Sequence, residues 1–141
     1  MSYVPVYCDI CARGSLWRAK HGHEPLSCAF CEGQTRPVPG PAYGDGDWLA
    51  FAEIDDAVFE AGLDAVQAAS LAAELQAGFD RGEPLVRLVA RMLELEPALS
   101  AARLALSNQP DRGLRMLMTA LTARVRESPL ASNLERTRAP E

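Results

Sequence analysis

"CDICARGSLWRAKHGHEPLSCAFC", residues 8–31, contains every cysteine and both histidines of this 141-residue chain, with two cysteines at each end. Each pair has the form Cys-x2-Cys, and a gap of sixteen residues separates the pairs: Cys8, Cys11, Cys28 and Cys31. This spacing is typical of a site in which four thiolates hold one metal ion. The rest of the chain has neither residue type, so any thiol or imidazole chemistry is confined to this stretch.

Each cysteine pair is expected to form a tight turn, and glycines follow such turns where a positive φ is needed, here Gly14 and Gly33. Residues 15–20 are predicted to be a strand, 21–24 a turn and 25–28 a returning strand. With these features, residues 3–36 resemble a zinc ribbon. The resemblance implies one structural zinc held by the four cysteines. Neither turn contains a proline, and no glycine directly follows Cys11 or Cys31, so a treble-clef arrangement remains open.

A segment of about 35 residues buries too little apolar surface to fold alone, whereas zinc contributes on the order of 10 kcal/mol to such peptides. Iron, a redox dithiol or a disulfide pair are the alternatives to zinc. Four thiolates leave no open position for catalysis. His21 and His23 fall in the expected turn and are interpreted as exposed; they could instead replace a cysteine ligand or, with Arg13 and Lys20, shield the cluster's negative charge.

Trp17 allows two interpretations. It could cover the metal site as part of a small core, or it could be exposed beside Arg18 as a stacking or docking residue.

The formal charge of −5 is unevenly distributed. Residues 45–96 carry twelve acids against three arginines, whereas residues 97–141 carry seven arginines against four acids. A general nucleic-acid coat would be basic overall. No apolar run approaches about 18 residues and the first residues lack the pattern of a signal peptide, which predicts a cytoplasmic protein. Thirteen arginines against one lysine suggest a GC-rich, bacterial genome.

Residues 1–36 are thus expected to form a small β module, and the Pro/Gly-rich residues 37–46 a linker after which the second part folds separately. Residues 47–128 are predicted to be an all-α bundle, with residues 129–141 a disordered tail. Asp47 is a candidate cap of a helix ending at Gly62, and Asp64 with Gln67 forms a capping box. The second helix is expected to end near Gly78. Further helices are predicted at residues 84–95, 97–107 and 110–127, where prolines mark the first turns.

The helix at 84–95 has a broad apolar stripe and is expected to be central. The helix at 110–127 is also widely apolar, either through core packing or as an interface; with its flanking arginines and the acidic middle of the chain, it suggests a homodimer. Asp55 projects among apolar residues. It is expected at the edge of the stripe in water, or else paired with Arg87 or Arg91.

Three classes of function are open. A non-enzymatic adaptor or regulatory protein that binds a protein partner fits best. Nucleic-acid binding through the β module is the alternative and would use mainly basic residues with Trp17: Arg13, Arg18, Lys20, Arg36, Tyr3, Tyr7 and Phe30. An enzyme or redox protein is the weakest, since no nucleophile–base set or phosphate loop is found.

Overall fold

The computed structural model describes residues 3–18, 28, 31, 33–38 and 43–125. The chain begins with a three-stranded antiparallel sheet made of β1 (Tyr3–Cys8), β2 (Arg13–Arg18) and β3 (Arg36–Pro37). The strand order is β2-β1-β3, so β1 is the middle strand. β1 and β2 form a hairpin in which Tyr3 pairs with Arg18 and Cys8 with Arg13. The first cysteine pair therefore lies at the turn of this hairpin. The strand predicted at 15–20 begins earlier, and the turn and most of the returning strand predicted at 21–28 lie outside the described residues.

Helices make up the rest of the described chain, after a short 3-10 turn, η1 (Asp45–Asp47). They are α1 (Trp48–Ala61), α2 (Ala65–Asp80), α3 (Leu85–Leu95), the 3-10 helix η2 (Pro97–Ala102), α4 (Arg103–Asn108) and α5 (Pro110–Val125). This confirms the predicted fold class, a small β module followed by an all-α bundle. The helix predicted at 97–107 is divided into η2 and α4. None of the described helices is long and apolar enough to cross a membrane.

Local sequence signals explain several helix ends. Gly62 ends α1 with a φ of 64°, a left-handed conformation that glycine adopts without strain. The Asp64 carboxylate accepts a hydrogen bond from the Gln67 N–H at 2.7 Å, and the Gln67 side chain accepts one from the Asp64 N–H at 3.0 Å. The predicted capping box is thus confirmed. Asp47 precedes α1 but does not cap it, because its carboxylate binds the Gly44 N–H and Arg112 instead.

Helix α2 continues past the predicted end at Gly78. A Cβ at Gly78 would lie 2.4 Å from Leu88 Cδ1, so the glycine lets α3 approach α2 closely. Its absence of a side chain is therefore used for packing, and Gly82, with a φ of 67°, follows the helix end instead.

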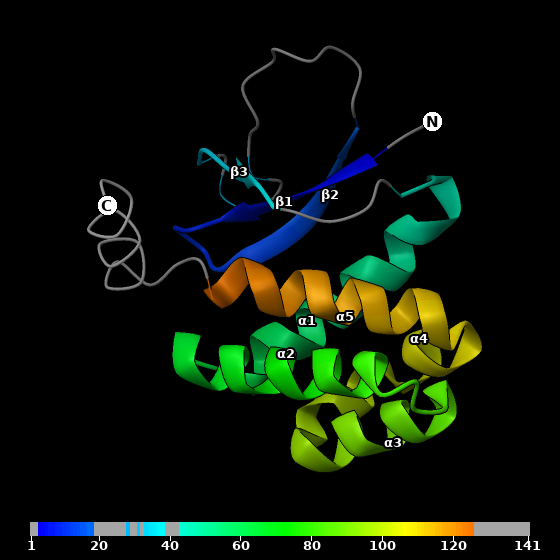
Figure 1. Cartoon of the computed structure of the whole chain (residues 1–141). Helices are drawn as coiled ribbons and strands as arrows, with labels where there is room; N and C mark the ends of the chain where they lie inside the picture. The colour runs from blue at the N-terminus through cyan, green and yellow to red at the C-terminus, as the bar shows by residue number, and fades with distance from the viewer. Residues whose placement is uncertain (1–2, 19–27, 29–30, 32, 39–42, 126–141) are drawn as a thin grey trace, which may run out of the picture.

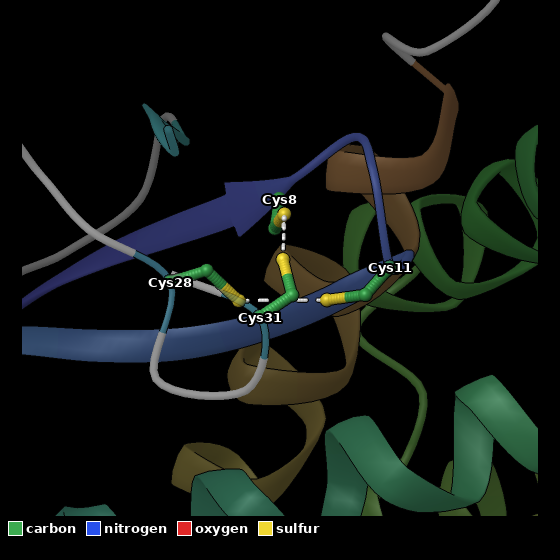
Figure 2. A group of neighbouring side chains, drawn as sticks. All are labelled: Cys8, Cys11, Cys28 and Cys31. Carbon is green, nitrogen blue, oxygen red and sulfur yellow. Dashed lines mark hydrogen bonds between the residues drawn. The ribbon is translucent and has the colours of Figure 1, made fainter. Parts of the chain in front are cut away.

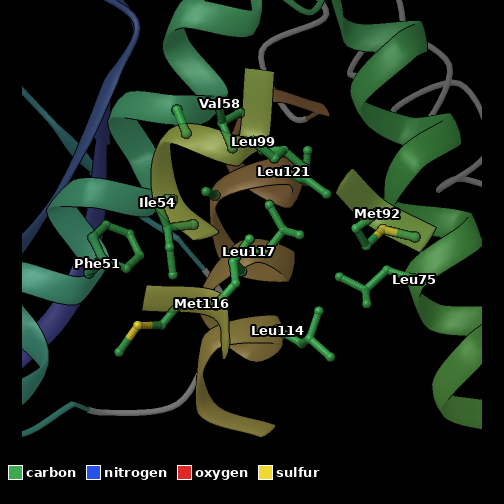
Figure 3. Close-up of a cluster of buried hydrophobic side chains, with 14 of the residues drawn as sticks. Phe51, Ile54, Val58, Leu75, Met92, Leu99, Leu114, Met116, Leu117 and Leu121 are labelled. Atoms are coloured by element: carbon green, nitrogen blue, oxygen red, sulfur yellow. The ribbon is translucent and has the colours of Figure 1, made fainter. Parts of the chain in front are cut away.

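The central helix is α5, and the prediction that residues 84–95 would be central is wrong. α5 lies between the sheet and α2, with α1 beside it (Figure 1). In α3 only Leu88, Val89 and Met92 are buried, and Val86 is 74% exposed. The apolar side chains of α5 instead fill the core, as Figure 3 shows for Leu114, Met116, Leu117 and Leu121. The apolar surface of α5 is wide because the helix is buried on both sides. The described residues of α5 therefore leave no broad apolar face open to a second copy of the chain.

The sheet and the helices share apolar contacts. Leu16 of β2 belongs to the same buried cluster as the residues of α1 and α5. Tyr7 of β1 packs with Val38 and Ala123. Tyr43, inside the predicted linker 37–46, is buried and its Oη lies 3.0 Å from Thr119 Oγ1 of α5. That the β module and the helical bundle fold independently stays a prediction. The contacts described here join the two parts, so an experiment must test whether each part folds without the other.

Candidate metal centre

Two turns present the four cysteines. Cys8 is the last residue of β1, and Cys11 lies in the turn to β2. That turn is closed by the Ala12 N–H, which donates to the Cys8 carbonyl at 2.9 Å. The second turn is closed by a bond in the opposite direction, because the Cys28 N–H donates to the Gly33 carbonyl at 2.7 Å. Backbone hydrogen bonds therefore fix the directions from which the thiols approach one another.

The four sulfur atoms converge on one point (Figure 2). Cys8 Sγ lies 3.5 Å from Cys31 Sγ, and Cys11 Sγ lies 3.4 Å from Cys28 Sγ. All four sulfurs lie within 4.8 Å of one another. A tetrahedral ion with metal–sulfur bonds of about 2.3 Å requires sulfur–sulfur distances of about 3.8 Å. A disulfide would need about 2.05 Å, and none of the four cysteines forms one. The cluster is therefore arranged to bind one metal ion.

The thiols differ in burial. Cys8 and Cys28 are buried, Cys11 is intermediate and Cys31 is exposed. Burial and hydrogen bonds from the neighbouring thiols raise the pKa of Cys11 to about 12. The backbone of Gly33 lowers the pKa of Cys31, but the Cys8 thiol and burial raise it by more. Without metal Cys11 and Cys31 therefore stay protonated at neutral pH, and an incoming cation must displace their protons.

Gly33 leaves space beside the cluster. A Cβ at this position would lie 2.7 Å from Ile10 Cδ1, 3.2 Å from Cys31 Sγ and 3.8 Å from Cys8 Sγ. The prediction that Gly14 and Gly33 take positive φ is wrong, since Ala12 takes it, with φ of 61°. Both glycines are needed for close approach instead. Gly14 lies directly against Asp55, as described below.

Those of the other predicted site residues that the structure describes do not join the four cysteines as ligands. Arg13 Nη1 donates to Asp56 Oδ1 at 2.7 Å, and its guanidinium lies over the Phe59 ring. Arg36 Nε pairs with Asp9, and Trp17 is half-buried on β2, opposite Val4. Both histidines, Lys20 and the side chain of Arg18 lie outside the described residues, as do Phe30 and the predicted tail.

The sequence reasoning missed a buried ion pair next to the first cysteine turn. Asp55 is 2% exposed, and its Oδ1 accepts a hydrogen bond from Arg124 Nη1 at 2.8 Å. The expectation of Asp55 in water is therefore wrong, and so are the suggested partners, because Arg87 is exposed and Arg91 pairs with Glu83. Burial raises the pKa of Asp55, whereas the charge of Arg124 and the Gly14 N–H oppose this rise.

A sequence signal for this pair exists. Arg124 follows Ala120 and Leu121 by four and three residues, so helical periodicity places it on the buried face of α5. An arginine and an aspartate on the apolar faces of two helices are expected to meet, because neither charge is buried cheaply alone.

Comparison of the chain with models of known protein families, with curated proteins and with solved structures finds no match. The functional interpretation therefore depends on the residues and geometry described above.

Proposed function

We propose that this chain is a non-enzymatic zinc-binding adaptor or regulatory protein, in which one structural zinc is held by Cys8, Cys11, Cys28 and Cys31. The convergence of the four sulfurs is the observation that carries this proposal. Four soft, anionic ligands whose sulfur atoms lie within 4.8 Å of one another favour zinc among common cellular cations. With four thiolates bound, zinc has no open position for water or substrate, so its role is to hold the two turns together.

A partner protein is favoured by the surface of the helical part. The described residues include a pocket of about 640 Å³ between the beginning of α1, α4 and the beginning of α5. Leu49 and Leu104 line it and are 68% and 82% exposed. Large apolar side chains exposed beside a concave surface are typical of sites that bind another protein. In the adaptor role, this surface and the metal module both contact the partner protein.

The zinc part of the proposal is tested by metal analysis of the full chain purified under reducing conditions. We expect one zinc per chain, lost in a Cys11→Ser, Cys28→Ser variant. A His21→Ala, His23→Ala variant is the control, because it should keep its zinc if all four ligands are cysteines. A reduced wild-type protein without metal would contradict the proposal, and zinc loss in the histidine variant would contradict the ligand set.

The adaptor part is tested by affinity purification from the native cell extract. Proteins retained by the wild-type chain should be lost by a Leu49→Glu, Leu104→Glu variant, since charge in the pocket opposes apolar contact. An Ala101→Glu variant changes an exposed residue outside the residues that line the pocket and serves as the control. Identical retention by all three proteins would contradict a role for this surface.

A further inference from the structure

A buried ion pair joins the first cysteine turn to two helices of the bundle. Asp55 of α1 accepts a hydrogen bond from the Gly14 N–H at 2.9 Å through Oδ2. Arg124 of α5 donates to the Ala12 carbonyl at 3.0 Å through Nη2. Their own contact is the 2.8 Å bond between Arg124 Nη1 and Asp55 Oδ1. Ala12 and Gly14 lie one and three residues after Cys11, so the pair fixes the backbone that positions this ligand.

The burial of both charges makes these bonds necessary. The side chains of Asp55 and Arg124 are 2% and 5% exposed. A buried charge is tolerated only when its hydrogen-bonding capacity is met, and removing a partner is strongly destabilising. Arg124 Nη1 is also bound to the Ala120 carbonyl within α5, but Nη2 donates to the turn. If residues 12–14 moved away, Arg124 would lose the Ala12 carbonyl and Asp55 would lose the Gly14 N–H.

A second contact links the same turn to the end of α5. Arg36 Nη2 donates to the Ala123 carbonyl at 2.8 Å, while its Nε is 3.2 Å from Asp9, the residue after Cys8. Ala123 and Arg124 are adjacent, so both sides of the first cysteine turn are connected to the last turn of α5. The metal module and the helical body therefore meet through specific polar contacts as well as apolar packing.

We propose that Asp55 and Arg124 are positioning residues for the four-cysteine centre, and that metal occupancy in turn stabilises the packing of α1 and α5. The inference rests on the proposed binding of metal at these cysteines. Outer residues that orient metal ligands commonly change metal affinity by about 10- to 100-fold. Coupling between metal binding and helix packing is reciprocal. If the ion pair tightens metal binding by a given factor, bound metal must stabilise the packed helices by the same factor.

The test uses the full chain and measures two quantities. Zinc affinity is measured by competition with a chromophoric chelator, and helix unfolding is followed by circular dichroism with and without zinc. In an Asp55→Asn, Arg124→Met variant both charges are removed together, because replacing a whole buried pair is tolerated better than breaking it. We expect zinc binding about tenfold weaker or more. The zinc-induced stabilisation of the helices should fall by the same factor, about 1.4 kcal/mol for tenfold.

Asp56→Asn is the matched control. Asp56 is the neighbour of Asp55 on α1 and also binds β2, through Arg13, but the Asp56 side chain is 59% exposed. The substitution removes this one carboxylate. An exposed ion pair contributes little, so both quantities should stay close to wild type. Bound zinc that stabilises the helices equally in the wild type and the double variant would overturn the inference while leaving the proposed function intact. A wild type that binds no zinc would overturn both.

If the double variant does not fold, hydrogen exchange on the wild-type chain decides. Zinc removal should reduce amide protection in the last turn of α5 and around Asp55 more than in α3, which among the described residues packs mainly on other helices and η2. Equal changes in α3 and α5, or none in either, would contradict the coupling.

Discussion

At the scale of single residues, two glycines are used for close approach. Gly33 leaves room for the sulfur cluster, and Gly14 lies against a buried carboxylate. Neither has a positive φ, so the sequence rule that assigns glycine to left-handed turns gave the wrong reason for both. The contacts that explain them come from residues far along the chain, which local sequence patterns do not reveal.

Gly14→Ala is expected to destabilise the protein. The new Cβ would lie 2.6 Å from Asp55 Oδ1 and 3.2 Å from Asp55 Cγ. Asp55 is held by Arg124 and cannot swing away without leaving a buried charge, so the cost should be about 1–3 kcal/mol of unfolding free energy. Chemical denaturation followed by circular dichroism measures it. Gly46→Ala is the control, because its Cβ would meet nothing within 4 Å. Equal stability of the two variants would mean that Asp55 does not lie against Gly14.

At the scale of elements, the sequence predicted which segments are helical better than how they pack. Capping signals are local, so Gly62 and the Asp64–Gln67 box were identified from a few neighbouring residues. The helix at 84–95 was expected to be central, and the helix at 110–127 to be either core or interface, but α5 is the enclosed helix while Val86 of α3 is exposed. Likewise the spacing of the four cysteines predicted the metal ligands from the sequence alone. Arg124 contacts the first cysteine turn only because α5 ends beside the sheet.

The corner between α4 and α5 gives the second prediction. A Cβ at Gly113 would lie 2.8 Å from the Ala105 carbonyl oxygen and 2.9 Å from Leu106 Cα. These are backbone atoms of α4, so they cannot move aside as a flexible side chain could. Alanine would gain about 1 kcal/mol of helix propensity over glycine, but overpacking costs about 1–3 kcal/mol and, against backbone, the upper end applies.

Gly113→Ala should therefore reduce the free energy of unfolding by about 2 kcal/mol, measured by urea denaturation. Ser107→Ala, at an exposed position of α4, is the control and should change stability little. A Gly113→Ala protein as stable as the wild type would show that α4 can separate from α5 at no cost.

At the scale of the whole molecule, the charge asymmetry is partly satisfied within the chain. The basic residues 97–141 supply Arg112 to Asp47 and Arg124 to Asp55 in the acidic middle. The predicted homodimer depended on pairing these opposite charges between two copies and on the apolar face of α5. In the described residues, Arg112, Arg124 and the buried side chains of α5 are engaged inside one chain, and the homodimer stays a prediction.

The same charge arrangement leads to the last prediction, that the intact protein binds mixed DNA or RNA weakly. Four basic residues belong to the β module: Arg13, Arg18, Lys20 and Arg36. Arg13 and Arg36 already pair with Asp56 and Asp9, so each would have to give up an ion pair to reach a phosphate. Even with all four released, the logarithm of affinity would fall with the logarithm of salt at a slope no steeper than about −3 to −4. The acidic residues within 45–96, some of them in α1, which packs against β2, repel the nucleic-acid backbone further.

A gel-shift series at physiological salt should show no complex at low micromolar protein, with single- or double-stranded probes. The decisive variant is Arg18→Ala with Lys20→Ala, the two basic residues whose side chains lie outside the described part of the chain. Arg103→Ala on α4 is its matched control. A salt-sensitive shift that survives in the control and disappears in the double variant would contradict the prediction. It would assign the binding to the far end of the β1–β2 hairpin, because Arg18 ends β2 opposite Tyr3 whereas the cysteine turn lies at the other end. In that case phosphate contacts and the metal centre would lie at opposite ends of the same hairpin, and the metal would act only by holding the strands in place.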